Sequence, residues 1–250
     1  MHIKSVKFPV VNPGADFCVI LKDNLPKIGD NSILAITSKI VSLFESRVIA
    51  KKDVKIKADL VKQESDFYLE TSQDNPMFIT IKHGMLIPAA GIDESNGDDR
   101  YVLYPLSPFA SAERIWRYVK ELFGIKNLGV IITDSHTTPM RRGVTGIALS
   151  WCGLGATRNC IGRCDIFKNR LQYTYVNNID ALAAAAVFTM GEADEQTPTA
   201  IITNAPNITF TQAPPSQDEV NSFMINLEED LYGPILNRAN WIKGGGGSAL

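Results

Sequence analysis

The pattern of hydrophobic and polar positions along the chain predicts six short strands. Residues 77–84 (MFITIKHG) alternate as in a strand with one buried face. Residues 128–134 (LGVIITD) are almost entirely apolar, which predicts a strand buried on both faces. The other expected strands span residues 32–37, 145–150, 171–176 and 199–203.

The clearest helical signal covers residues 107–124. Ser107 is placed to cap this helix, Pro108 suits its first position, and Gly124 ends it. One face is apolar at helical spacing, through Ala112, Ile115, Trp116, Val119, Leu122 and Phe123. This spacing predicts an amphipathic helix that packs against a core.

A second helix is expected over residues 177–191. It is apolar nearly all round, which predicts burial, and Gly191 is its natural end. Strands and helices mix without a regular βαβ rhythm, so the expected fold class is α+β. Residues 1–243 are expected to form a single unit with room for two subdomains, and residues 244–250 (GGGGSAL) a flexible linker or a tail added by engineering.

Composition excludes several classes of protein. The 250 residues carry a formal net charge of −2, so no basic surplus points to nucleic acid. No apolar run approaches the ~18–20 residues of a membrane helix, and the N-terminal residues do not resemble a signal peptide. Four cysteines are too few for a disulfide scaffold. The expected location is the cytoplasm.

Three acidic residues stand at the ends of apolar elements. Asp93 lies in the acidic turn of residues 89–99 (AAGIDESNGDD), Asp134 ends an apolar run, and Glu192 follows a helix stop. Carboxylates from distant segments suit Mg²⁺ or Mn²⁺, which prefer oxygen ligands. Single acidic residues after strands are also common as caps and turn formers, so both interpretations stay open at this point. A shared metal site predicts that the three carboxylates lie together.

Two further motifs leave alternatives open. Arg141 and Arg142, between two expected strands, can pair with phosphate or carboxylate oxygens or form a solvated basic turn. Residues 153–157 (GLGAT) only partly match a dinucleotide fingerprint, and no phosphate-binding P-loop motif occurs. The spacing of Cys152, Cys160 and Cys164 fits no common zinc pattern, so ordinary thiols are expected.

Several motifs in order resemble one family, the F420-0 γ-glutamyl ligases. The segments PAAGIDESN, IITDSHTTPMRRG, DALAAAAVFTMGEADE, ILAITSKIVSLFESR and EEDL are similar to its signatures, over roughly residues 8–235. The resemblance implies a family-specific α+β fold, an intertwined homodimer and amide-bond formation. It also implies GTP, or ATP, as cofactor with Mn²⁺ or Mg²⁺, and K⁺ as a further cation. The carboxylate acceptor would pass through an acyl phosphate before L-glutamate attacks.

The resemblance also implies roles for individual residues. The catalytic positions are Asp93, Asp134 and Glu192, and the metal ligands are Asp93, Asp134, Ser135 and Glu192. The nucleotide-binding positions are Pro9, Val10, Val11, Ser38, Lys39, Asn96, Met190, Gly191, Ala193 and Asp194. The acidic turn would thus hold a metal that holds a phosphate.

The chain departs from the family pattern outside the metal positions. Leu43 replaces a lysine that contacts nucleotide, and Asn159, Ile161 and Lys168 differ within another motif. Loss of an arginine at Ile161 favours a folate acceptor if that position faces the acceptor, and otherwise only repacks a strand. Three hypotheses follow: a ligase acting on the deazaflavin, the same chemistry on a folate, or a nucleotide-binding protein without catalysis.

Overall fold

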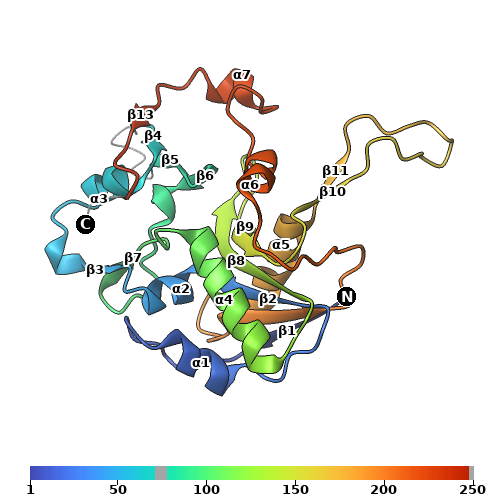
Figure 1. Ribbon diagram of the computed structural model, residues 1–250. Helices are drawn as coiled ribbons and strands as arrows, with labels where there is room; N and C mark the ends of the chain where they lie inside the picture. The colour runs from blue at the N-terminus through green and yellow to red at the C-terminus, as the bar shows by residue number, and fades with distance from the viewer. Residues whose placement is uncertain (71–77, 248–250) are drawn as a thin grey trace.

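A five-stranded mixed sheet forms the centre of the computed structural model, which describes residues 1–70 and 78–247 (Figure 1). Its strands lie in the order β1-β12-β2-β8-β9; β2 and β8 run parallel, and the other neighbours are antiparallel. Their bounds are β1 His2–Val6, β2 Ser32–Thr37, β8 Leu128–Thr137, β9 Val144–Cys152 and β12 Thr199–Thr203. The mixture of sheets and helices confirms the α+β class.

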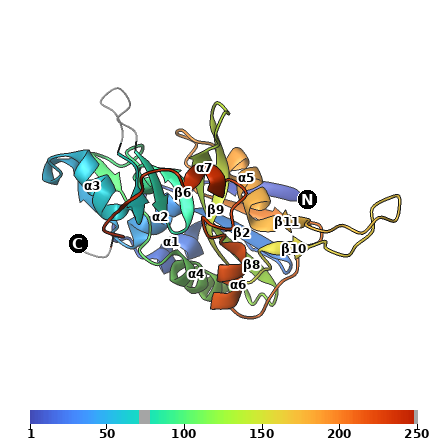
Figure 2. The same cartoon turned by 90° about the horizontal axis from the view of Figure 1, so that it is seen from above.

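Helices cover both faces of this sheet, because its central strands are apolar on both faces (Figure 2). On β2, Leu34 and Ile36 pack in the cluster that includes α4, and Ile33 and Ala35 pack in the cluster that includes α5. This division follows from the two-residue repeat of a strand. The helices are α1 Phe17–Asn24, α2 Ser38–Phe44, α3 Lys57–Glu64, α4 Pro108–Phe123, α5 Asn178–Met190, α6 Gln217–Phe223 and α7 Gly233–Leu236.

The two predicted helices are confirmed, with two corrections, the first being that the Ser107 side chain makes no capping hydrogen bond to α4. α4 starts at Pro108 and ends at Gly124, whose φ of 64° is the left-handed conformation that favours glycine. α5 starts after Asn177, whose side chain accepts a hydrogen bond from the Asp180 backbone. The prediction that α5 is buried nearly all round is wrong in part: Phe188 is 91% exposed. Its outer face is apolar but uncovered within this chain.

A second layer of short strands lies beside the central sheet, on the side that carries α3 (Figure 2). It contains a four-stranded sheet in the order β13-β4-β5-β6 and the pair β3-β7. The predicted strand at 77–84 corresponds to β5, although Met77 lies outside the described residues. The bounds are β3 Val48–Ala50, β4 Phe67–Tyr68, β5 Ile79–Lys82, β6 Met85–Pro88, β7 Arg100–Val102 and β13 Ile242–Lys243.

The glycine tail is docked rather than flexible, which corrects the expectation for residues 244–247. The Gly244 and Gly246 amides donate to the Asp66 and Ser65 carbonyls, at 2.9 and 2.8 Å. A Cβ on Gly244 would lie 2.2 Å from the Ser65 carbonyl oxygen, so only glycine fits there. Lys82, which is almost fully buried, donates to the Gly246 carbonyl at 3.0 Å. Residues 248–250 lie outside the described part of the chain.

An arm, defined as residues 157–177, projects from the rest of the chain (Figure 1). Its base is the strand pair β10 Thr157–Asn159 and β11 Tyr175–Asn177. The predicted strand at 171–176 is therefore wrong for residues 171–174. At the far end, the Asp165 side chain accepts hydrogen bonds from the amides of Phe167 and Asn169, both at 2.8 Å, which closes a turn.

Candidate active site

A pocket of about 410 Å³ lies at the carboxyl end of β2, where Thr37 pairs with Thr133 of the parallel strand β8. The carboxyl ends of parallel strands are a common place for ligands. Five segments from distant parts of the sequence meet there. They contribute residues 8–11, four residues around the start of α2 (Thr37, Lys39, Ile40, Leu43), the acidic turn (Asp93, Asn96, Asp98), residues 133–135, and Val187 with residues 190–198.

The pocket brings together nearly all of the residues that the sequence singled out. Asp93, Asp134, Ser135 and Glu192 line it, as do the expected nucleotide-binding residues except Ser38. Ser38 is buried and does not line the pocket. The roles of these residues as ligands stay predictions; what the fold supplies is their common location.

The basic doublet lies elsewhere. Arg141 and Arg142 are exposed on the hairpin between β8 and β9, and neither lines the pocket. Among the described residues, the hydrogen bonds of Arg141 are local, to Thr138 and Met140. Within this chain, the solvated-turn interpretation of the doublet therefore fits better than phosphate binding in the pocket.

The acidic turn has a backbone that few residues tolerate. Asn96, Asp98 and Asp99 all have φ values between 47° and 61°, in the left-handed region where asparagine and aspartate are favoured after glycine. Gly97 has no room for a side chain, since a Cβ would lie 2.4 Å from the Arg100 carbonyl oxygen. The polar composition of this turn thus has a conformational cause as well as a chemical one.

Within the turn, Asp93 and Asp98 are carboxylates that line the pocket, and Asp93 is the more tightly held. Its backbone pairs with Val102, and its side chain forms an ion pair with Lys39 at 2.6 Å. Ser95 donates to it from its amide and its hydroxyl, at 2.7 and 2.8 Å. Burial raises the pKa of Asp93, but Lys39 and Ser95 outweigh that effect and hold the pKa below its usual range. Asp93 is therefore a fixed, ionised group.

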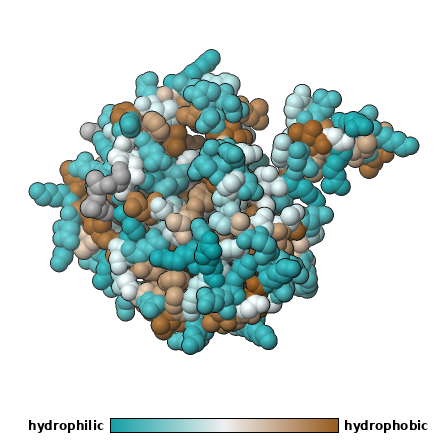
Figure 3. All heavy atoms as spheres, in the orientation of Figure 1, coloured by the Kyte–Doolittle hydropathy of each residue, from teal (hydrophilic) through white to brown (hydrophobic). Residues whose placement is uncertain are grey.

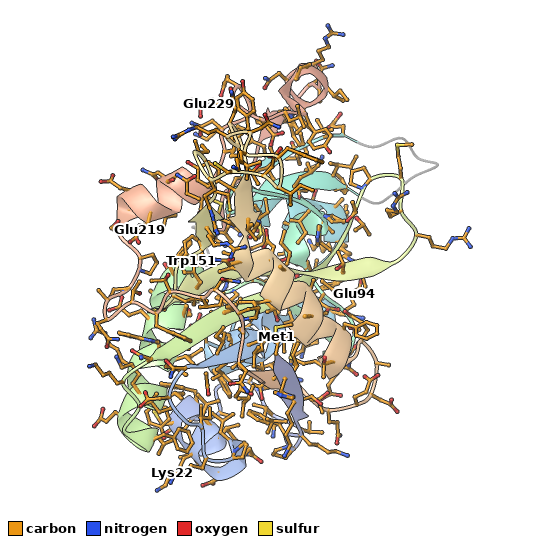
Figure 4. All side chains as sticks on the ribbon, turned by 90° about the vertical axis from the view of Figure 1, so that its right-hand side faces the viewer. Met1, Lys22, Glu94, Trp151, Glu219 and Glu229 are labelled. Atoms are coloured by element: carbon orange, nitrogen blue, oxygen red, sulfur yellow. The ribbon has the colours of Figure 1, made fainter. Side chains whose placement is uncertain are left out.

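The neighbouring Glu94 points to a different set of partners. Lys51 pairs with it at 3.0 Å, and Lys57 pairs with its other oxygen. Both lysines hold the pKa of Glu94 below its usual range. Glu94 is labelled in Figure 4; Asn96 of the same turn donates to the Ala193 carbonyl, just beyond α5, at 3.0 Å. The turn is thereby tied to the opposite wall of the pocket.

Asp134 follows a change of register between β8 and β9. The pairing shifts between Ile132 and Thr133, so β9 contributes one extra residue at that point. Such a bulge re-aims the side chains that follow it. Tyr104 donates a hydrogen bond to Oδ2 of Asp134, and the Ser135 amide donates to the same carboxylate. Burial raises the pKa of Asp134 to about 6, and these hydrogen bonds only partly offset it.

Glu192 projects from the loop that follows α5. Gly191 before it has φ 83° and ψ 172°, a conformation that residues with a side chain rarely adopt. Glycine is therefore required at the turn that releases the chain from the helix. Burial raises the pKa of Glu192, while a hydrogen bond with the Ser135 side chain acts against that shift. Ser135 thus lies between Asp134 and Glu192.

Sequence reasoning missed several lining residues, such as Asp98, Thr133 and Val187, and it also missed Tyr104, which contacts Asp134. Tyr104 is 3% exposed and lies behind the pocket wall, where burial and the nearby Asp134 raise its pKa well above the usual value. It therefore stays a proton donor. The only signal in the sequence is an aromatic residue beside a proline, which does not predict a contact with a strand 30 residues later.

The donors in the pocket fit a hard divalent cation by chemistry. Asp93, Asp134, Ser135 and Glu192 offer only oxygen atoms, the ligands that Mg²⁺ and Mn²⁺ prefer. Like charge on Asp93 also raises the pKa values of Asp134 and Glu192, a repulsion that a cation would relieve. As placed, however, no group of three or more His, Cys, Asp or Glu residues in the described ranges forms a metal site. The three-carboxylate cluster stays a prediction.

The other wall of the pocket is apolar. Phe8, Val11 and Ile40 are buried core residues that reach it, and Leu43 packs beside them. Leu43, which departs from the family pattern, thus extends an apolar surface where a lysine would bring charge. The cysteines lie outside the pocket: Cys152 and Cys160 are buried, Cys164 is exposed, and all are unpaired. This fits the expectation of ordinary thiols.

The protein is therefore an α+β protein whose pocket has one apolar wall and one acidic wall. The sequence pattern of the family described as F420-0:Gamma-glutamyl ligase matches residues 5–204. The chain belongs to this family of ligases.

Curated relatives support the same assignment. A coenzyme F420:L-glutamate ligase of Methanococcus maripaludis (strain C7) is 31% identical over 82% of this chain and 89% of its own length. The coenzyme F420:L-glutamate ligase of Methanothermobacter thermautotrophicus is 32% identical over 79% and 86%. That of Methanocaldococcus jannaschii is 33% identical over 73% and 79%. In the described residues, no helix is long and apolar enough to cross a membrane.

Proposed function

We propose that this protein is a γ-glutamyl ligase that joins the amine of L-glutamate to a carboxylate acceptor of the F420-0 type, using a nucleotide and a divalent cation. The observation that carries the proposal is the meeting of five distant segments at one pocket, with the acidic residues of the family motifs on one wall. The names of the curated relatives support the acceptor.

The two walls of the pocket suit the two ends of a nucleotide. The apolar wall of Phe8, Val11, Ile40 and Leu43 offers a surface for the base and sugar. Lys39 and Asn96 stand near the acidic residues, where they can donate to phosphate oxygens. Leu43 offers no charge, so we expect nucleotide affinity weaker by about 1–3 kcal/mol than in a relative with lysine.

Asp93, Asp134, Ser135 and Glu192 would hold the cation. When bound, Mg²⁺ or Mn²⁺ supplies positive charge that offsets the negative charge of a transferring phosphoryl group. Phosphoryl transfer to the acceptor carboxylate gives an acyl phosphate, and the glutamate amine then displaces phosphate to form the amide. The protein residues position these groups and need not react themselves.

We further propose that the protein acts as a homodimer. The outer face of α5 carries Ala181, Ala184, Ala185 and Phe188 at helical spacing, and Phe188 is exposed. The arm carries Ile166, Phe167 and Tyr173, each more than three-quarters exposed, and Figure 3 shows hydrophobic residues on it. Large exposed apolar side chains on a projecting arm are typical of an interface, and a second copy of this chain would bury them.

The folate alternative gains no support from the position of Ile161. This residue lies on the arm, 46% exposed, and does not line the pocket of its own chain. The loss of an arginine at position 161 therefore has no geometric link to acceptor recognition in the pocket of the same chain. Tetrahydrofolate is therefore included in the assay as a second candidate acceptor.

A single assay tests the proposal. Purified protein with Mn²⁺, labelled glutamate and either GTP or ATP is offered the deazaflavin acceptor and tetrahydrofolate in parallel. We expect a labelled amide product with the deazaflavin acceptor only. Product with folate alone would transfer the function to the folate hypothesis, and product with neither acceptor would favour a nucleotide-binding protein without catalysis.

A further inference from the structure

Tyr104 touches the pocket only through Asp134. Its side chain is buried and does not line the pocket, and its hydroxyl donates to Oδ2 of Asp134. Whatever it contributes to the reaction must therefore act through the orientation of that carboxylate.

The ring of Tyr104 is held from two sides. A Cβ on Gly91 would lie 2.1 Å from the ring carbon that carries the hydroxyl, so the ring occupies the space that this glycine leaves. His83 stacks near the ring, with centroids 6.3 Å apart and planes inclined by 27°. These contacts leave the hydroxyl one direction, toward Asp134.

The backbone of Tyr104 is fixed as well. Arg47 donates from Nε to the Tyr104 carbonyl at 3.0 Å, and its Nη2 pairs with Glu64 at 2.7 Å. Glu64 is 1% exposed. A buried ion pair of this kind holds its partners in one geometry, since each charge depends on the other.

Asp93 and Asp134 differ in how they are oriented. Asp93 has Ser95 on one oxygen and Lys39 on the other. Asp134 has no ion-pair partner among the described residues, and the carboxyl torsion of an aspartate is intrinsically broad. The Ser135 amide also donates to this carboxylate, and the hydroxyl of Tyr104 is the side-chain donor that holds Oδ2.

We propose that Tyr104 is a positioning residue: its hydroxyl occupies Oδ2 of Asp134 and leaves Oδ1 to meet the ligand in the pocket. The inference rests on the proposed function, because it gives Asp134 a cation to meet. Partners behind a ligating carboxylate commonly matter to metal affinity by about 10- to 100-fold.

The test compares two tyrosines that lose the same atom. Tyr104→Phe removes the hydroxyl and keeps the ring. Tyr118→Phe is the matched control, because the Tyr118 hydroxyl donates to the Cys18 carbonyl at 2.6 Å and neither residue lines the pocket. Mn²⁺ alone is titrated into each protein and followed by electron paramagnetic resonance, with thermal unfolding as the check on folding.

We expect Mn²⁺ to bind Tyr104→Phe about 10- to 100-fold more weakly than wild type, with a broadened bound-ion spectrum, and Tyr118→Phe to match wild type. A purely structural role of Tyr104 would shift the unfolding midpoint and leave the spectrum alone. Gly91→Ala, which displaces the ring, gives a second variant with the same expected direction.

The possible outcomes separate this inference from the proposed function. If wild type binds Mn²⁺ and Tyr104→Phe binds it equally well, the positioning role is overturned and the proposed metal site stands. If wild type does not bind Mn²⁺, both are overturned. Weaker binding by Tyr104→Phe with wild-type binding by Tyr118→Phe supports the role.

Discussion

The pocket and the arm hold their side chains in opposite ways. In the pocket, each important group has a partner from a distant segment of the same chain: Lys39 with Asp93, Tyr104 with Asp134, and Asn96 with Ala193. Beyond its base, the arm makes mostly contacts within itself, and its large apolar side chains face solvent. One chain thus completes the pocket but leaves the arm without cover.

The departures from the family pattern follow much of the same division. Asn159, Ile161 and Lys168 lie on the arm, whereas Asp93, Asp134, Ser135 and Glu192 line the pocket. Leu43 is an exception inside the pocket. A side chain that is held by several partners can rarely be replaced without losing those contacts. An exposed surface can be replaced more freely, together with the surface that packs on it. Under the proposed function, this division predicts that the chemistry is retained and that the surface of the arm has changed.

The largest effect should come from the pocket. Asp134→Asn removes a charge that the proposed reaction needs, and we expect ligase activity to fall about 100- to 1,000-fold. Asp30→Asn is the control, because Asp30 also accepts two backbone hydrogen bonds, from Lys126 and Asn127, but lies outside the pocket lining. Steady-state kinetics would contradict the comparison if both variants lost activity equally.

The free energy of unfolding should depend on pH through the layer behind the pocket, because this layer is shielded from water. Burial lowers the pKa of His83 from 6.5 to about 4. As pH falls below 6.5 the unfolded chain takes up the proton first, so the free energy of unfolding should drop by up to about 3 kcal/mol between pH 6.5 and 4. His83→Gln should flatten this slope, measured by urea unfolding across that range.

The matched control for the pH experiment is His2→Gln, since His2 is exposed on β1. Its unfolding should keep the wild-type dependence on pH. An equal flattening of the pH dependence in both variants would mean that the layer behind Tyr104 is as exposed to water as the surface. The contrast between this layer and the arm would then be weaker.

Substitutions on the exposed outer face of α5 should change the dimerisation of the protein. Phe188→Glu places a charge on the outer face of α5, and we expect it to weaken dimerisation by at least about 2 kcal/mol, the size of an interface hot spot. Val19→Glu is the control, because Val19 is an apolar residue, 50% exposed, on another helix, α1. Sedimentation velocity over a range of concentrations measures the difference. A monomeric wild type would remove the proposed interface altogether.

The smallest effect should separate packing from backbone strain. Gly91 and Gly162 have φ values of 70° and 80°, so alanine strains both. Only at Gly91 would the new Cβ meet a ring, that of Tyr104; at Gly162, on the arm, nothing lies within 4 Å. We expect Gly91→Ala to destabilise the protein by about 1–3 kcal/mol more than Gly162→Ala, in denaturant unfolding. Equal losses would show that the pocket is no more tightly packed than the arm.

Elements with strong local signals were predictable from the sequence. The strands at 32–37 and 199–203 have the expected bounds, because continuous apolar runs flanked by turns leave little choice. β8 extends beyond Asp134 to Thr137 because the hairpin that joins it to β9 continues the pairing through polar residues. Polar residues give no such signal in advance.

Contacts between distant segments were not predictable by local reasoning. The four glycines of the tail have the composition of a flexible linker, yet their amides donate hydrogen bonds to carbonyls of residues 62–66, so close that a Cβ on Gly244 would clash with the backbone. The Tyr104–Asp134 contact joins two segments that carry no shared pattern. The family motifs identified the acidic residues, but not which neighbours orient them.

The order of strands in the central sheet also determines when the pocket can form. β12 lies between β1 and β2, so β1 can pair only after β12 has been synthesised; Val6, for example, pairs with Thr199. Pairings so far apart in sequence form slowly, and the nascent chain meanwhile exposes unpaired strand edges. Residues 190–198 of the pocket lead directly into β12. Closing the sheet and completing the pocket are therefore the same late event in the maturation of this protein.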